Sequence, residues 1–215
     1  MPAAETRHRP YSSELREQQA ATTRDRVIRA ALARFSASGY ERTTLADIAT
    51  EAQVSVETVR SHGPKSALIR AAMECISPEY RGETFLESPV GHQYVEQASL
   101  RDLLDFAVIV STEVNRNSWG IWAALGAAAA TDPELEQTFV DRLAVSRGEI
   151  AEIVDLVVDR GWSRADRTRD ELVLRAWIAC APETYERLVR RGGLTESEYT
   201  EWLRRTLDDL VSPRS

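Results

Sequence analysis

The chain has 215 residues, of which 43% are hydrophobic and 28% are charged, a composition typical of a folded globular protein rather than a disordered chain. Its longest apolar run, residues 121–130, is about half of what a membrane-spanning helix needs, and the N-terminal segment lacks the apolar stretch of a secretory signal. The net charge of −7, averaged over the whole chain, argues against nucleic-acid binding.

The charge is unevenly distributed along the chain. Residues 1–70 carry 11 Lys and Arg against 8 Asp and Glu, whereas the remainder carries 16 against 26. A basic N-terminal part joined to an acidic remainder is expected of a DNA-binding domain fused to a second domain.

Helical periodicity begins near residue 20, after a polar segment that we expect to be a mobile arm. Thr23 is the expected N-cap of the first helix, and Gly39 is expected to end it. One apolar stripe follows the helical spacing: Ile28, Ala31, Leu32 and Phe35.

Two short helices are predicted next. Thr44 caps the first, with Asp47 completing a capping box. After a break at "QVS", Ser55 caps the second, which runs to His62 and is closed by Gly63. This spacing is that of a helix-turn-helix, in which the second helix enters the major groove of DNA. By pattern alone, two surface helices of an ordinary bundle are an equally good interpretation.

In the helix-turn-helix interpretation, four apolar residues form the core side of the two helices: Leu45, Ile48, Val54 and Val59. Val56, Glu57, Arg60 and Ser61 are then expected to face outward. Val56 can contact a thymine methyl group, Glu57 can accept a hydrogen bond from cytosine N4, and Arg60 can bond to guanine or to a phosphate.

Longer helices are predicted for the rest of the chain, and strand-like alternation is missing. Ser163 is expected to precede the helix over 167–191, which Pro182 should kink. A capping box, "TESE", opens the last helix. The predicted helical ranges are 64–76, 100–117, 119–130, 133–160, 167–191 and 196–211. The fold class is therefore all-α, with about nine helices.

No motif indicates an enzyme or a metal site. The histidines His8, His62 and His92 are scattered, and Cys75 and Cys180 match no metal-ligand spacing. The sequence has neither a Gly-rich phosphate loop nor a G-x-S-x-G elbow. We expect no catalytic residue, no metal and no cofactor, and an enzyme of unrecognised type is the less favoured alternative.

The stretch "RVIRAALARFSASGYERTTLADIATEAQVSVETVR", followed by Lys65, resembles the N-terminal domain of TetR-type (tetracycline-repressor-type) transcription regulators. The resemblance covers about residues 23–75 and is specific in spacing from Phe35 through Thr58. The end of the chain, "PETYERLVRR…GLTESEYTEWL", also resembles a C-terminal pattern of the family. This resemblance implies a homodimer, a ligand pocket in the acidic part, and an interface formed by the last two helices.

The resemblance also implies contacts with DNA. Thr44 would contact a phosphate with its side chain and amide, and Lys65, the only lysine, would contact another. The complete set of expected DNA-binding residues is Thr43, Thr44, Ser55, Val56, Glu57, Thr58, Arg60, Ser61, His62 and Lys65. Arg60 replaces the usual aromatic residue, a usual Phe after His62 is missing, and Gln53 replaces a frequent Gly, which predicts a positive φ at Gln53.

Two further sets belong to the acidic part. Apolar residues of the middle helices are candidates for the ligand pocket: Phe106, Ile109, Val110, Trp119, Trp122, Leu125, Phe139 and Trp177. Residues of the last helices are candidates for the dimer interface: Leu174, Ile178, Tyr185, Leu188, Tyr199, Trp202, Leu203 and Leu207. Packing in the chain's own core is the alternative for each of them.

We thus expect a mobile arm (1–20), a helix-turn-helix DNA-binding domain (21–66) and a helical ligand-binding and dimerisation domain (67–215). The expected function is that of a cytoplasmic, ligand-responsive transcription regulator, a repressor released from a palindromic operator by a small apolar or aromatic molecule. The alternative is a helical homodimer that binds a small molecule or a protein without recognising DNA.

Overall fold

The computed structural model describes residues 11–76 and 96–211, and every regular element among them is a helix, as predicted. The first four helices form the head: α1 (Tyr11–Ser38), α2 (Leu45–Ala52), α3 (Val56–Ser61) and α4 (Lys65–Ile76). The remaining elements form the body: α6 (Leu100–Ala129), α7 (Pro133–Asp159), α8 (Arg169–Cys180), α9 (Pro182–Tyr185), the π-helical turn η3 (Glu186–Arg191) and α10 (Glu196–Val211).

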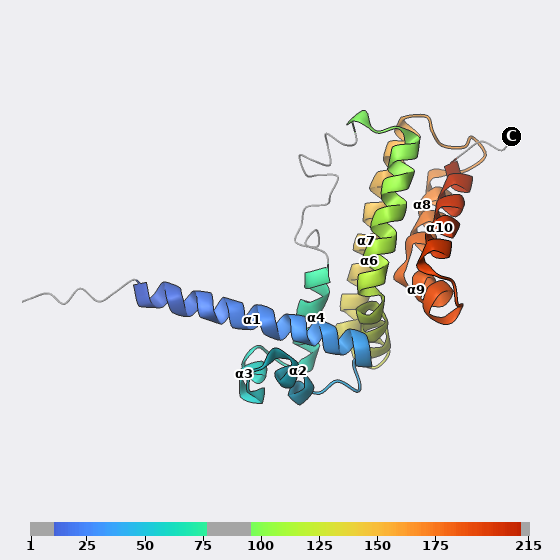
Figure 1. Cartoon of the computed structure of the whole chain (residues 1–215). Coiled ribbons are helices and arrows are strands. Elements are labelled where there is room, and N and C mark those ends of the chain that lie inside the picture. Colours follow the sequence, from blue (N-terminus) through green and yellow to red (C-terminus); the bar gives the residue numbers. More distant parts are fainter. Residues whose placement is uncertain (1–10, 77–95, 212–215) are drawn as a thin grey trace, which may run out of the picture.

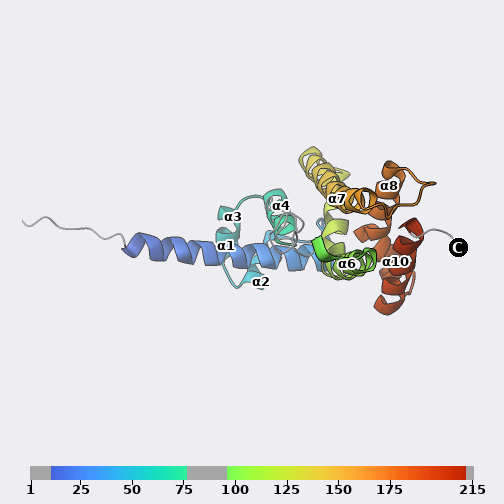
Figure 2. The same cartoon turned by 90° about the horizontal axis from the view of Figure 1, so that it is seen from above.

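The head and the body lie at an angle to each other (Figure 1). α1 runs across the lower end of α6, and α2 and α3 lie below α1 in this view. Seen from above, α6, α7, α8 and α10 stand together as a bundle from which α1 extends away (Figure 2). No helix in the described part of the chain is long and apolar enough to span a membrane.

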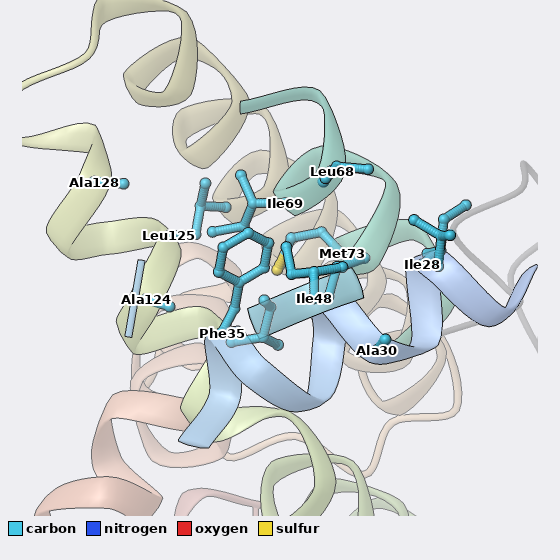
Figure 3. Close-up of a cluster of buried hydrophobic side chains, with 14 of the residues drawn as sticks. Ile28, Ala30, Phe35, Ile48, Leu68, Ile69, Met73, Ala124, Leu125 and Ala128 are labelled. Atoms are coloured by element: carbon cyan, nitrogen blue, oxygen red, sulfur yellow. The ribbon is translucent and has the colours of Figure 1, made fainter. Parts of the chain in front are cut away.

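One hydrophobic core joins the head to the lower end of the body. Figure 3 shows Phe35 of α1 with Ile69 and Met73 of α4 and Leu125 of α6, and all four side chains are fully buried. Gly120 lets α1 and α6 approach closely, because a Cβ atom at this position would lie 2.7 Å from the Ser36 carbonyl oxygen. The core therefore does not divide at the expected domain boundary near residue 66.

A second core fills the upper body between α6, α7, α8 and α10. It contains one buried polar side chain with two partners: Asn115 Nδ2 donates to the Cys180 carbonyl oxygen at 2.8 Å and to the Tyr199 hydroxyl at 3.2 Å. These two bonds tie α6 to the C-terminal end of α8 and to α10, which fixes the position of the chain break that follows Cys180.

Several predicted helix ends are confirmed. Asp132 caps α7 by accepting from the amides of Glu134 and Leu135, and the capping box between Thr195 and Glu198 opens α10. The chain also breaks at Ala181, where the backbone is extended directly before Pro182.

Three predicted boundaries are wrong. Thr23 lies inside α1, where its hydroxyl donates to the Gln19 carbonyl, because the helix starts at least three turns earlier, at Tyr11. The expected arm is therefore helical over residues 11–20, and residues 1–10 lie outside the described residues. α6 is one continuous helix where two were expected, since residues 117–119 contain no proline or glycine that would break it. α8 begins at Arg169, two residues after the predicted start, and Thr168 caps it.

Candidate nucleic-acid interface and ligand cleft

Both ends of α2 have the geometry that the sequence predicts. The Thr44 side chain accepts from the Asp47 amide at 3.1 Å, and the Asp47 carboxylate accepts from the Thr44 amide at 2.8 Å. Gln53 ends α2 in the left-handed conformation, with φ 55° and ψ 46°. The positive φ expected at this non-glycine position is confirmed.

α3 is a short capped helix with one buried side. Ser55 Oγ accepts from the Thr58 amide at 3.0 Å and lies 2.8 Å from the Thr58 hydroxyl. Val59 is fully buried, and Val56 packs half-buried against the head core instead of facing fully outward. His62 ends the helix, its amide donating to the Val59 carbonyl oxygen.

Three side chains on the outer face of α3 are exposed to solvent: Glu57, Arg60 and Ser61. Arg60 lies 3.5 Å from the Glu57 carboxylate, and both side chains are more than half exposed. Such an exposed ion pair contributes little free energy, so Arg60 can exchange this partner for a phosphate or a base at small cost.

The two threonines before α2 have partners within the chain that limit contact with DNA. Thr43 is 1% exposed, and its hydroxyl donates to the Gly39 carbonyl oxygen at 2.8 Å, so its side chain is not available to DNA. The hydroxyl and the amide of Thr44 both donate to the Asp47 carboxylate. A phosphate at Thr44 therefore has to compete with this carboxylate.

Lys65 begins α4 and is held in a defined position. Its ammonium donates to the Tyr40 carbonyl oxygen at 3.0 Å and lies 4.2 Å from the centre of the Tyr40 ring, which itself packs on Phe35. Gly63 precedes it with φ 119°, a conformation that favours glycine. An ammonium has three protons, so the carbonyl leaves donors on Lys65 for a second acceptor.

Comparison with known proteins shows what the head of this chain is similar to. Residues 27–62 match the family model described as bacterial regulatory proteins, tetR family. The resemblance to TetR-type regulators is confirmed. A comparison with curated protein sequences finds no match.

Solved structures of transcriptional regulators are similar over about 90% of this chain. A protein from Saccharomonospora viridis, assigned as a transcriptional regulator and in complex with choline, shares 18% identity with a TM-score of 0.71, over 90% of this chain and 100% of that one. A protein assigned to the TetR family, from Rhodococcus sp., shares 18% identity with a TM-score of 0.68, over 89% and 100%. NalD, the secondary repressor of the MexAB-OprM multidrug efflux pump in Pseudomonas aeruginosa, shares 19% identity with a TM-score of 0.64, over 91% and 100%. At these identities the likeness establishes the fold.

Within this TetR-type fold, three of the eight expected pocket residues meet in one cleft. Trp122, Phe139 and Trp177 line a cleft of about 430 Å³ between α6, α7, α8 and the segment after Pro182. The other five lie elsewhere. Leu125 is in the head core, Phe106 and Trp119 are half-buried outside the cleft, and Ile109 and Val110 are exposed on α6.

The cleft also has polar lining residues that the sequence prediction missed. Ser146 of α7 accepts a hydrogen bond from the Trp177 indole nitrogen at 3.2 Å, and Glu183 and Arg187 lie on the far side, after the break at Pro182. Pro182 was the signal that could have indicated Glu183 and Arg187, because a proline interrupts a helix and an interrupted helix exposes side chains that a continuous helix would pack.

The expected dimer-interface residues divide into two groups. Four of them are at most 5% exposed: Tyr185, Tyr199, Leu203 and Leu207. They pack in the chain's own core, which was the alternative to a dimer interface. Leu188 and Trp202 are half-buried against the same core. Only Leu174 and Ile178 are exposed among the eight, at 45% and 54%, one turn apart on α8.

Among the described residues, no group of three or more His, Cys, Asp or Glu side chains is placed to hold a metal ion.

Proposed function

We propose that this chain is a sequence-specific DNA-binding transcription regulator. The observation that carries the proposal is the coincidence of the tetR family match, residues 27–62, with a capped helix-turn-helix whose second helix exposes Glu57, Arg60 and Ser61. The function is binding rather than catalysis, in the cytoplasm where the operator lies.

The proposed DNA contacts follow from which groups are available. Arg60 is exposed on the outer face of α3 and is assigned to a base or a phosphate. Lys65 retains donors at the start of α4, where the helix dipole also favours a phosphate. Thr44, Ser55 and Thr58 act chiefly as caps that position α2 and α3, because their hydroxyls already have partners.

The proposed regulator is a homodimer, since a helix-turn-helix protein gains specificity from two half-sites about 34–36 Å apart. α8 is the proposed interface helix because Leu174 and Ile178 present adjacent apolar side chains to solvent. Release from a palindromic operator by a small molecule is the proposed regulation, with the cleft beside Trp122 as its site. The complex of the Saccharomonospora viridis protein with choline supports small-molecule binding in this fold.

The test is an electrophoretic mobility shift with DNA that flanks the gene for this chain, at several salt concentrations. We expect a salt-sensitive complex that unlabelled random DNA does not displace. Lys65→Ala should weaken binding on all sequences and reduce the salt slope by about one unit. Arg60→Ala should do the same if Arg60 contacts a phosphate, or change the preferred bases if it contacts a base.

Arg205→Ala is the matched control, because Arg205 forms a similar exposed pair with Glu201 on α10, far from the head. A folded protein that gives no sequence-specific complex would refute the proposal. Such a protein that still forms dimers would favour the alternative, a helical homodimer that binds a small molecule or protein without DNA.

A further inference from the structure

The cleft in the body exists because the helix after α8 is interrupted. Asn115, which also donates to the Tyr199 hydroxyl, holds the C-terminal end of α8 through the Cys180 carbonyl oxygen, and the Thr184 hydroxyl donates to the Ile178 carbonyl across the break. The chain then continues as one α-helical turn and the π-helical turn η3, which directs Glu183 and Arg187 toward the cleft. π-helical turns are rare and occur frequently at functional sites.

The opposite walls of the cleft are aromatic. Trp122 of α6 meets the edge of Phe139 of α7, with 5.9 Å between ring centres and 69° between the planes. Trp177 of α8 is oriented by its hydrogen bond to Ser146. These rings come from three helices and line one cleft, so they favour a flat apolar group packed against them.

Both charged side chains that line the cleft lie on one segment and have opposite signs. Neither Glu183 nor Arg187 forms an ion pair or a side-chain hydrogen bond with any residue in the described ranges, 11–76 and 96–211. The two charges are therefore available to a bound molecule.

The sign of the two charges restricts which ligand gains from them. A ligand with one positive group is attracted by Glu183 and repelled by Arg187, and a ligand with one negative group is attracted by Arg187 and repelled by Glu183. In both cases the attraction and the repulsion oppose each other. A ligand that carries both charges at one end can pair with each residue at once. An uncharged ligand gains from neither.

We propose that the cleft binds a small molecule with a flat aromatic body and, at one end of it, both a cationic and an anionic group. This inference rests on the proposed function only in that such a molecule would be the effector. Trp122 lines the cleft and is also part of the core shared by the head and the lower body, so a ligand against its ring contacts the packing that orients α1.

The test uses three probes that share an indole-ethyl body: L-tryptophan has both charges, tryptamine only the ammonium, and indole-3-propionate only the carboxylate. Isothermal titration calorimetry of each into the full-length protein at pH 7.5 measures the dissociation constants. We expect L-tryptophan to bind about three- to tenfold more tightly than either single-charge probe, the range for one partly exposed charge-assisted contact.

Two variants assign the contacts. Glu183→Gln should remove the advantage of L-tryptophan over indole-3-propionate, and Arg187→Gln should remove its advantage over tryptamine. Glu201→Gln, on the outer face of α10, is the control and should change no dissociation constant. Equal binding of the three probes, binding of none, or the same effect of both cleft variants on all probes would overturn the proposal.

The titrations contain no DNA, so their outcome is independent of the mobility shift. A protein that forms the operator complex but binds none of the probes would refute this inference alone. A protein that binds L-tryptophan through Glu183 and Arg187 but forms no specific complex would refute the proposed regulator and leave the ligand class established.

Discussion

The contact between Gly120 of α6 and Ser36 of α1 offers a sharp test of how head and body are joined. In Gly120→Ala, the new Cβ atom would lie 2.7 Å from the Ser36 carbonyl oxygen and 3.1 Å from its Cα atom. Both neighbours are backbone atoms of α1. The clash can therefore be relieved only by moving α1 against α6.

The magnitude follows from two opposing effects. Overpacking of a filled interior costs about 1–3 kcal/mol. Alanine is favoured over glycine in a helix interior by about 1 kcal/mol. We therefore expect Gly120→Ala to lower the free energy of unfolding by between zero and about 2 kcal/mol. Gly120→Val adds two more methyl groups and should lower it further.

Gly148 of α7 provides the matched control. It is also helical, but it is exposed, and a Cβ atom there would have no neighbour within 4 Å. Gly148→Ala should therefore stabilise the protein by about 0.4–1 kcal/mol. Urea unfolding monitored by circular dichroism gives both values. Equal stabilisation of the two alanine variants would show that α1 and α6 do not meet closely at Gly120, because the difference between the variants isolates this contact.

Three further predictions concern single residues. Gln53→Gly should stabilise the head by up to about 1 kcal/mol, since the left-handed conformation costs residues other than glycine about 1–2 kcal/mol. Part of this gain is lost because glycine has more conformational entropy in the unfolded chain. Destabilisation in urea unfolding would contradict the prediction. The Thr44 hydroxyl and amide lower the pKa of Asp47, so its carboxylate contributes stability above its unfolded pKa of about 3.9, and this stability is lost as the pH falls through the lowered folded pKa. Asp47→Asn should therefore lower the melting temperature at pH 7, and this loss should shrink as the pH is lowered below the unfolded pKa. An equal loss at every pH would argue against the capping box. Burial raises the pKa of Cys180 to about 11, so in a Cys75→Ser background the native thiol should react with iodoacetamide far more slowly at pH 8 than the unfolded chain does, whereas equal rates by mass spectrometry would contradict its burial.

The helix-turn-helix could be predicted because its signals are local. Thr44, Asp47 and Ser55 each satisfy backbone groups within three residues. The ends of α7 and α10 were predictable for the same reason. The positive φ at Gln53 was expected for another reason, because the resemblance to TetR-type regulators places a frequent Gly at this position. Thr23 misled because a good capping residue within a helix can instead donate its hydroxyl to the carbonyl four residues earlier.

From the sequence alone one could read the all-helical class, the apolar face of most helices and the break at Pro182, but not that residues 11–20 are helical or that α6 is continuous. What covers each apolar face follows only from the packing of the helices in three dimensions. Tyr199 and Leu203 pack inward on α10 while Leu174 and Ile178 remain exposed on α8, although all four fit a helical stripe. Periodicity describes one helix at a time, whereas burial and the cleft depend on how several helices, distant in sequence, are placed against one another.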